Sequence, residues 1–342
     1  MTAAREAAEI LGRLLPAIER ALEAAVPHEG GLAVMVRYHL GWCDSDGNPA
    51  KNRTGKRIRP ALVLLAAQAM QGEIDDALPA AVAVELLHNF SLIHDDIQDR
   101  SPERHGRPTV WTVWGEAQAI NAGNVLHVLA HRSLAALADR RPPVGWAALQ
   151  RLYDTSLRLC DGQYLDLSYE QRPRIRLDDY LTMIAGKTAS LIGLALELGA
   201  MAATDDREVW MTYRQIGEQI GLAFQIWDDY LGIWGDPTLT GKPVGEDIAN
   251  RKKTLPAAYA FEHAVGEDLR VLIDAYRPGA AEPAPLAAVL DVFERVGARA
   301  YTEQLATETI DRALAALDSA PGALDPLADL ATLARYLVGR DR

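Results

Sequence analysis

Two clusters of aspartates are the residues of this sequence best suited to chemistry. Asp95, Asp96 and Asp99 form the first cluster, and Asp228 and Asp229 form the second. Each cluster ends an apolar run with helical spacing, where closely packed carboxylates would repel one another. Burying such charges costs several kcal/mol each unless cations compensate them. Divalent metals are the obvious compensator, and two facing clusters of this kind would hold metals around a diphosphate group.

The first cluster has the spacing of a helix face. Asp95 and Asp99 are four residues apart and Asp96 and Asp99 are three apart, so a helix brings them together. His88 and Ser91 extend the same stripe two turns and one turn earlier. Such carboxylates suit Mg²⁺, which takes a few carboxylate oxygens and completes its ligands with water and phosphate. A solvated acidic helix end is the alternative, although acids at a helix C-terminus oppose the macrodipole.

Cations follow both clusters and precede two of the apolar helices. An arginine fork matches phosphate oxygens, and a helix start such as the one near Gly186 adds backbone N–H groups. Exposed ion pairs and solvated basic loops, which contribute little energy, are the alternative interpretation. The positions beside the acidic clusters favour anion binding. The segments that carry these cations are residues 54–60, 100–109, 186–188 and 235–254.

Several common catalytic signatures are absent from the sequence. It contains no GxSxG, HExxH or GxGxxG motif, and Gly241-Lys242 does not complete a P-loop. The chemistry that remains is that of metals, cations and an apolar interior.

The composition excludes several classes of function. A net charge of −12 argues against a nucleic-acid partner, so any anion site is built locally. Cys43 and Cys160 are too few for a disulfide framework, and we expect a reduced, cytoplasmic protein. Residues 1–27 form an amphipathic pattern and not a signal peptide. The apolar stretch 191–203 is too short for a bilayer, so we expect no transmembrane segment.

Apolar residues recur with helical period through most of the 342 residues. Glycine and proline mark the breaks, and neither strand alternation nor an internal repeat is evident. We therefore expect one all-α domain, residues 1–342, built as a helical bundle. The predicted helices are 3–26, 57–71, 75–99, 115–138, 144–169, 177–201, 205–234, 253–264, 266–276, 284–317 and 325–338.

In their order along the chain, these pieces resemble the trans-polyprenyl diphosphate synthases, a family of class I isoprenoid synthases that includes geranylgeranyl and farnesyl diphosphate synthases. The resemblance runs from about residue 54 to residue 256. It implies an all-α bundle around a deep central cavity, a homodimer, and condensation of isopentenyl diphosphate with an allylic diphosphate. The matching pieces are Gly-Lys-Arg-Ile-Arg-Pro at 55–60, His-Asn-Phe-Ser-Leu-Ile-His-Asp-Asp at 88–96, Asp99 with Arg104, Gly-Lys-Thr at 186–188, Phe-Gln at 224–225, Asp228-Asp229, and Gly241-Lys242 with Lys252.

The resemblance also implies roles for individual residues. Asp95, Asp99 and Asp228 would bind three Mg²⁺ ions, and Asp96 and Asp229 would support them. Together with Lys187 these carboxylates form the expected catalytic set. The diphosphate of isopentenyl diphosphate would be bound by Lys56, Arg59, His88 and His105. The allylic diphosphate would be bound by Arg104, Lys187, Thr188, Gln225, Lys242 and Lys252.

Two positions depart from the pattern of the family. The family has two adjacent arginines after the first cluster, and His105 stands in place of the second, which binds isopentenyl diphosphate. The second motif of the family ends in a third aspartate, whose place Gly232 takes in this chain. Asp236 lies eight residues after Asp228 and is a candidate to compensate for that loss.

The resemblance also bears on product length. In the family, the residues five and four before the first aspartate help to form the cavity floor, and here they are Phe90 and Ser91. A bulky Phe90 beside a small Ser91, without an insertion in the Asp motif, resembles the short-chain synthases. We expect a product of fifteen or twenty carbons and favour geranylgeranyl over farnesyl diphosphate.

Two other functions stay open at this stage. A terpene cyclase or another prenyltransferase could share the fold, but the residues from Asp228 onward do not match the second motif of the cyclases. Retention of Lys56, Arg59 and His88 also favours a second diphosphate substrate. A non-catalytic regulatory subunit of a heteromeric synthase is the other alternative, and such a subunit is expected to lose the first Asp motif.

Overall fold

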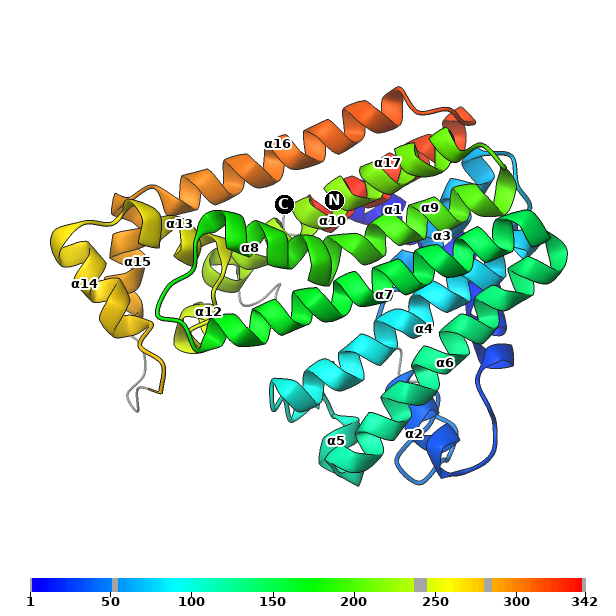
Figure 1. The fold of residues 1–342 in the computed structure, drawn as a ribbon, viewed down its shortest axis with the longest axis horizontal. Coiled ribbons are helices and arrows are strands. Elements are labelled where there is room, and N and C mark those ends of the chain that lie inside the picture. Colours follow the sequence, from blue (N-terminus) through cyan, green and yellow to red (C-terminus); the bar gives the residue numbers. More distant parts are fainter. Residues whose placement is uncertain (1, 51–54, 237–244, 280–284, 340–342) are drawn as a thin grey trace. The chain divides into compact units, whose positions relative to one another are not determined.

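The protein is almost entirely helical in the computed structural model, which describes residues 2–50, 55–236, 245–279 and 285–339 (Figure 1). Within these residues the strands are limited to β1 (Glu103–Arg104) and β2 (Arg107–Pro108), which pair as a short antiparallel hairpin. The prediction of an all-α protein is therefore confirmed. The chain divides into two compact units. The single domain expected for residues 1–342 stays a prediction.

Unit 1 consists of residues 1–153, 194–214 and 320–333. Four helices, α7, α9, α10 and α17, contribute residues to both units. The helices that begin within residues 1–153 are α1 (Thr2–Ala25), α2 (Gly31–His39), α3 (Ile58–Ala69), α4 (Ile74–Gln98), α5 (Val110–Trp114), α6 (Glu116–Arg140) and α7 (Pro142–Glu170).

Unit 2 consists of residues 154–193, 215–319 and 334–342. A π-helical turn, η1, joins α8 and α9 into one continuous run. The remaining elements of the described chain are α8 (Leu177–Ile184), η1 (Ala185–Ala189), α9 (Ser190–Ala203), α10 (Arg207–Trp234), α12 (Glu246–Ala249), α13 (Leu255–His263), α14 (Gly266–Ala275), α15 (Leu286–Arg295), α16 (Ala298–Asp318) and α17 (Leu324–Gly339).

The core of unit 1 is built on α3 and α4. Residues 60–67 of α3 and 80–87 of α4 are all buried, because alanines alternate with larger aliphatic side chains and let the helices approach closely. α4 also packs along α6, as Figure 1 shows for the cyan and blue-green helices. This packing fixes α4, which carries the first acidic cluster at its C-terminal end.

The core of unit 2 gathers around the C-terminal half of α10. Ile233 of α10 packs with Ile248 of α12, Phe261 of α13 and Phe293 of α15 in one buried apolar cluster. Tyr276 completes this cluster from the end of α14. The cluster holds α12 against α10, which carries the second acidic pair.

The structure corrects the predicted helices in several places. The single helix expected over 284–317 is two helices, because Gly297 adopts a left-handed conformation (φ 78°) that ends α15. The short helices α2, α5 and α12 lie where no helix was predicted. The hairpin β1–β2 lies where only a loop was expected, and its turn residues His105 and Gly106 both have positive φ.

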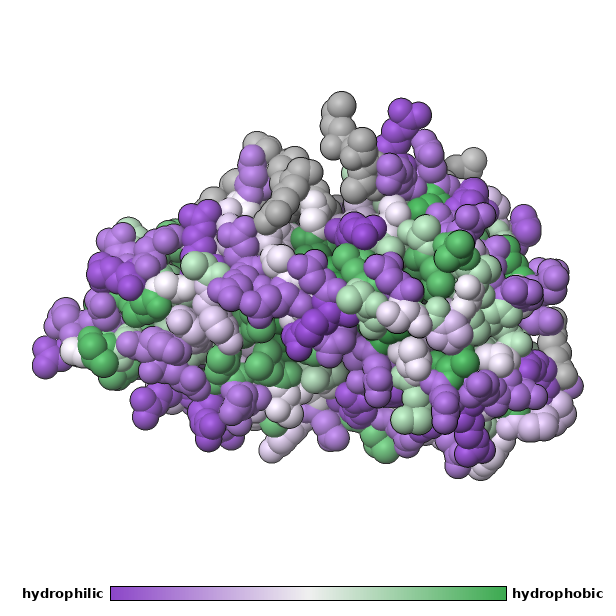
Figure 2. Space-filling view, turned by 90° about the horizontal axis from the view of Figure 1, so that it is seen from above, coloured by the Kyte–Doolittle hydropathy of each residue, from purple (hydrophilic) through white to green (hydrophobic). Residues whose placement is uncertain are grey.

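Two helical stretches are long and apolar enough to cross a bilayer by length and composition alone. They are Ile74–Gln98 and Leu177–Ala203, and 61% and 72% of their most apolar windows are buried inside the structure. Such burial is typical of core helices in soluble proteins, which pass the same test. Figure 2 shows a mostly hydrophilic surface with small apolar patches on the face that it draws. The absence of a transmembrane segment remains a prediction.

Candidate active site

The first acidic cluster lies at the C-terminal end of α4. Asp99 is the C-cap residue, and its backbone N–H donates to the Asp95 carbonyl oxygen at 2.8 Å. Asp95 is partly exposed and Asp99 is exposed, whereas Asp96 is only 2% exposed. Carboxylates at the negative end of a helix macrodipole are unfavourable without a cation. Asp95 and Asp99 are therefore the accessible carboxylates of the cluster, and Asp96 is the buried one.

Asp96 holds Arg104 in place. Arg104 donates through Nε to Asp96 Oδ1 at 2.8 Å, and its Nη2 lies 2.7 Å from the same oxygen. The hairpin β1–β2 positions Arg104 opposite Arg107, beside the end of α4. Burial raises the pKa of Asp96, and the ion pair with Arg104 opposes that shift. The other oxygen of Asp96, Oδ2, is buried without a hydrogen-bond partner among the described residues.

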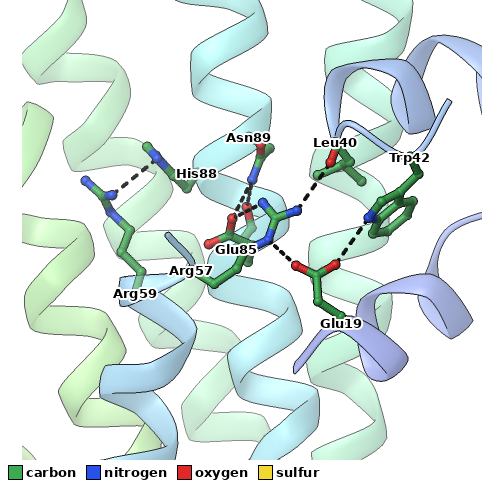
Figure 3. Close-up of polar contacts among 8 residues, drawn as sticks. All are labelled: Glu19, Leu40, Trp42, Arg57, Arg59, Glu85, His88 and Asn89. Carbon is green, nitrogen blue, oxygen red and sulfur yellow. Dashed lines mark hydrogen bonds and ion pairs between the residues drawn. The ribbon is translucent and has the colours of Figure 1, made fainter. Parts of the chain in front are cut away.

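Arg57 is the buried centre of the basic segment that precedes α3. It donates through Nη1 to Glu85 Oε1 at 2.8 Å and through Nε to Glu19 Oε1 at 2.9 Å, as Figure 3 shows. Burial opposes its charge, but Glu85 and Glu19 together raise the pKa of Arg57 above its usual value. Asn89 donates to Glu85 Oε1 at 3.0 Å and completes the network. The sequence identified this segment as cationic but did not assign Arg57 a role.

Arg57 also sets the backbone at the start of α3. Its φ of 52° is left-handed, which is uncommon for a residue other than glycine. Such a conformation persists where surrounding contacts over-determine it. Lys56, just before Arg57, lies exposed at the surface. Arg59, two residues after Arg57, lies on α3.

The structure brings together Arg59 and His88, two of the residues predicted to bind isopentenyl diphosphate. Arg59 Nη1 lies 3.2 Å from His88 Nε2 (Figure 3). Burial, and then the charge of Arg59, lower the pKa of His88 well below its usual value, so the imidazole is neutral. Because a guanidinium can only donate, Nε2 accepts and the ring proton sits on Nδ1. His88 can therefore donate a hydrogen bond from Nδ1 to an anionic ligand.

A pocket of about 530 Å³, including space open to solvent, lies beside His88 in unit 1. His88, Arg104 and His105 line it together with Arg57 and His39. Part of the His39 surface is exposed, but burial of the ring, and then the charge of Arg104, lower its pKa to about 3. The pKa of His105 is also lowered, by burial and by Arg104. The arginines therefore supply the positive charge of this pocket, and the histidines line it as neutral groups.

The second acidic pair divides its roles in the same way as the first. Asp228 is partly exposed on α10, whereas Asp229 is buried. Asp229 accepts hydrogen bonds from the Tyr180 hydroxyl, from the backbone N–H of Leu255 at 2.8 Å and from Gln225 Nε2 at 3.1 Å. Burial nevertheless raises the pKa of Asp229 to about 7. Asp229 thus ties α10 to α8 and α13, and Asp228 is the more accessible carboxylate of the pair.

Three of the residues predicted to bind the allylic diphosphate, Lys187, Thr188 and Gln225, lie at or beside η1 in unit 2. Thr188 donates through Oγ1 to Gln225 Oε1 at 2.8 Å, and Lys187 forms an ion pair with Asp166 of α7. A Cβ built at Gly162 would overlap the backbone of Lys187, so only glycine lets α7 approach η1 this closely. Single π-helical turns occur frequently at functional sites.

Lys242 and Lys252 are the two remaining cations predicted to bind the allylic diphosphate, and the structure describes only one of them. Lys242 lies outside the described residues. Lys252 is exposed, and its Nζ lies 4.0 Å from Asp247 Oδ1. Asp247 itself is buried on α12, and the sequence did not identify it as a site residue. The only feature of the sequence that could have indicated Asp247 is its position in the basic loop after Asp228 and Asp229.

The donor chemistry of the predicted metal ligands fits a hard divalent cation. Asp95 and Asp99 in unit 1 and Asp228 in unit 2 offer carboxylate oxygens and no sulfur or imidazole. Over the described ranges, no group of three or more His, Cys, Asp or Glu side chains is arranged to hold a metal alone. This is compatible with Mg²⁺, which takes one or two carboxylates and completes its shell with water and substrate phosphates.

Phe90 lies one turn before the first acidic cluster and contacts α6. Its ring centroid is 4.8 Å from that of His127 and 4.7 Å from that of His94. Ser91 donates through Oγ to the His88 carbonyl oxygen at 2.8 Å and projects little bulk. Phe90 is therefore the bulky residue of the two that the family resemblance assigns to the cavity floor.

Known proteins resemble this chain over most of its length. The polyprenyl synthetase family matches residues 47–293. A (2E,6E)-farnesyl diphosphate synthase of Mycobacterium tuberculosis is 40% identical over 330 residues, which cover 96% of this chain and 90% of that protein. A geranylgeranyl diphosphate synthase of the same organism is 42% identical over 315 residues, or 92% and 88%. The crystal structure of a polyprenyl synthetase from Streptomyces coelicolor matches with a TM-score of 0.90 and 36% identity, covering 96% of this chain and 99% of that one. The resemblance and fold class inferred from the sequence are confirmed.

The network around Arg57 predicts a large loss of stability when its charge is removed. Arg57→Met keeps most of the side-chain length but leaves the buried carboxylate of Glu85 without its cation. Breaking a buried pair in this way lowers the free energy of unfolding by about 3–5 kcal/mol, which urea denaturation measures. Arg5→Ala is the control, because the exposed Arg5–Glu9 pair contributes less than about 1 kcal/mol. Equal effects of the two substitutions would show that the network is not structural.

Proposed function

We propose that this chain, which belongs to the polyprenyl synthetase family and is a trans-polyprenyl diphosphate synthase of the short-chain type, makes geranylgeranyl diphosphate in a Mg²⁺-dependent reaction. The substrates of prenyl synthases are isopentenyl diphosphate and an allylic diphosphate. The observation that carries the proposal is the Asp96–Arg104 ion pair, which places an arginine of the basic pocket beside the outward carboxylates of α4. Diphosphate requires both partners, metal-binding carboxylates and a fork of N–H donors.

The basic pocket of unit 1 is proposed to bind isopentenyl diphosphate. Arg59 supplies charge, and His88 offers its Nδ1–H to a diphosphate oxygen because its Nε2 faces Arg59. His105 lines the same pocket in place of the second arginine of the family pattern, and Lys56 lies at the surface nearby in sequence. The positive charge of this pocket rests on arginines, so His105 contributes a hydrogen bond and little charge at neutral pH.

The allylic diphosphate is proposed to be held by cations and by a Mg²⁺ cluster. Asp95, Asp99 and Asp228 would hold the metals, which when bound stabilise the negative charge that develops on the departing diphosphate. The residues proposed to bind diphosphate oxygens directly are Arg104, Lys187, Thr188, Gln225, Lys242 and Lys252. Arg104 and Lys187 are each held by a carboxylate, Asp96 and Asp166, and so are oriented before substrate binds.

The proposed reaction has one bond broken and one formed. The allylic C–O bond breaks, and its electron pair leaves with the diphosphate, whose charge Arg104 and Lys187 stabilise. The double bond of isopentenyl diphosphate supplies the electron pair of the new C–C bond. The proton that this carbon skeleton then loses goes to the released diphosphate. Preorganised donors are effective here because they require no reorganisation when charge develops.

Chain length is proposed to be set by Phe90 and its contact with His127. The ring of Phe90 stands one turn before Asp95, where a growing chain directed away from the diphosphate would meet it. Relatives of similar identity are named farnesyl and geranylgeranyl diphosphate synthases, so both product lengths occur among them. The small Ser91 beside Phe90 favours the longer of these products.

The proposal extends to a homodimer formed through unit 1. Large apolar residues are exposed on α6 and on the first part of α7, namely Val128 (63% exposed), Trp146 (62%), Ile120 (45%) and Tyr153 (45%). Exposed apolar patches of this kind mark interaction sites in soluble proteins. A second copy of the chain is the partner that the family resemblance suggests.

A product assay tests the reaction. With Mg²⁺ and isopentenyl diphosphate plus dimethylallyl, geranyl or farnesyl diphosphate, we expect a twenty-carbon diphosphate by mass spectrometry. Asp95→Asn lowers kcat roughly 10²–10³-fold, because a charge-stabilising group at the departing diphosphate is lost. Asp75→Asn, at the other end of α4, is the matched control and keeps the activity. Hydrocarbons or alcohols formed from an allylic diphosphate alone would instead indicate a cyclase.

Removing the ring of Phe90 tests the proposed floor. Phe90→Ala opens space beside His127, and we expect the distribution of products to shift to longer chains when phosphatase-treated products are separated by chromatography. Ser91→Ala is the control, because it leaves the neighbouring bulk unchanged. An unchanged product distribution in Phe90→Ala would exclude Phe90 as the floor.

Light scattering on purified protein tests the dimer. We expect about twice the chain mass of 37.3 kDa for the wild type and a lower mass for Trp146→Glu, since a charge in an apolar interface is unfavourable. Met211→Lys changes an apolar residue of α10 that is 54% exposed, and it should leave the mass unchanged. A wild-type protein with the mass of one chain would refute the proposal.

A further inference from the structure

The short helix α2 contributes a residue to the basic pocket of unit 1. His39, the last residue of this helix, lines the pocket together with His88 of α4 and with Arg104 and His105 of the hairpin β1–β2. Part of His39 is exposed, so a ligand in the pocket can reach it. The family resemblance assigns no role to His39.

Contacts of Arg107 hold α2 against the hairpin. Arg107 donates through Nη1 to the Tyr38 carbonyl oxygen at 3.0 Å and through Nη2 to the Cys43 carbonyl oxygen at 3.1 Å. Its guanidinium carbon also lies 4.1 Å from the centroid of the Tyr38 ring. The Tyr38 hydroxyl in turn donates to the Pro108 carbonyl oxygen at 2.8 Å. Because His39 directly follows Tyr38, these contacts fix its backbone beside the hairpin.

The side chain of Asn89 orients the His39 ring. Asn89 donates through Nδ2 to the Glu85 carbonyl oxygen at 2.8 Å and to Glu85 Oε1 at 3.0 Å. Because Nδ2 faces Glu85, it is Asn89 Oδ1 that accepts the hydrogen bond from the His39 ring. Glu85 is itself fixed by its ion pair with Arg57 (Figure 3). One nitrogen of His39 therefore carries a proton that is directed to Asn89.

The arginines of the pocket keep His39 neutral in the free protein. Burial, and then the charge of Arg104, lower its pKa to about 3. An anion in the pocket acts in the opposite direction, because a nearby negative charge favours the protonated ring. The charged and titratable groups that line the pocket with His39 are Arg57, Glu85, His88, Asp96, Arg104, His105 and Arg107.

A neutral His39 differs from a neutral His88 in what it offers to an anion. A neutral imidazole has one N–H group. His88 accepts from Arg59 through Nε2, so its proton on Nδ1 is available to a ligand. The proton of His39 is engaged by Asn89, so His39 donates to a ligand as well only when both of its nitrogens are protonated.

We propose that His39 is a further binding residue for the diphosphate of isopentenyl diphosphate, and that this binding places a second proton on its ring. The proton comes from solvent, and the ring changes from imidazole to imidazolium. The site thereby gains a cation from α2, at a pocket where His105 stands in place of an arginine of the family pattern. This inference rests on the proposed function, which places isopentenyl diphosphate in this pocket.

Isothermal titration calorimetry counts the protons taken up on binding. Isopentenyl diphosphate is added to the full-length protein with EDTA and without an allylic substrate, in buffers that differ in ionisation enthalpy. At about pH 7 we expect His39→Gln to take up about 0.5–1 fewer protons per bound ligand than the wild type, because an amide donates without being protonated. His28→Gln changes an exposed histidine that does not line the pocket, and as the matched control it takes up as many protons as the wild type.

The pH dependence of the affinity separates this role from a structural one. A ligand that raises the pKa of a ring binds more tightly as the pH falls through the raised pKa, and this contribution is lost at higher pH. We therefore expect the ratio of Kd in His39→Gln to Kd in the wild type to rise by up to about tenfold per pH unit between about pH 8 and about pH 6. A histidine with only a structural role would leave this ratio independent of pH.

The possible outcomes are distinguishable. Equal proton uptake by the wild type and a folded His39→Gln variant, or a ratio of Kd values that does not change with pH, would overturn the inference and leave the proposed function intact. A wild-type protein that binds isopentenyl diphosphate without taking up protons would overturn the inference even where the variant fails to fold. A wild-type protein that does not bind isopentenyl diphosphate would overturn the proposed pocket and this inference with it.

Discussion

Compensation of buried charge is the constraint on which this structure depends. Arg57 is buried with its side chain 4% exposed, and it persists as a cation because carboxylates from α1 and α4 pair with it. The pair with Glu85 connects the start of α3 to α4, and the pair with Glu19 connects it to α1. A buried guanidinium without both partners would cost more than the packing around it could offset. Arg57 thus links α1 and α4 to the start of α3, where the basic segment lies.

The same constraint explains why the pocket is basic but contains neutral histidines. Arginine keeps its proton when buried, whereas imidazole loses its proton when burial and neighbouring arginines disfavour the charge. His39 and His88 therefore serve as hydrogen-bonding groups, and Arg57 and Arg104 serve as charges. His105 lines the same pocket, and its lowered pKa means that it adds little positive charge.

The sequence predicted the helices well because each has a periodic apolar pattern, and it predicted the family because acidic and basic motifs occur in a characteristic order. It missed the break at Gly297, since apolar periodicity continues through 284–317 and only a left-handed glycine ends α15. It also missed α2, which is short and lies between turns. Arg57 escaped detection for another reason. Its partner Glu19 is 38 residues away in sequence, and no local pattern specifies such a contact.

Both acidic motifs show why two adjacent aspartates are used. Successive residues of an α-helix point in directions about 100° apart, so a pair cannot face one ligand with both side chains. Asp95 and Asp228 are partly exposed, whereas Asp96 and Asp229 are buried and accept hydrogen bonds from other elements. The second aspartate of each pair therefore anchors its helix to other elements, whereas the first is partly exposed. The position of the exposed carboxylate thus depends on what its buried neighbour binds.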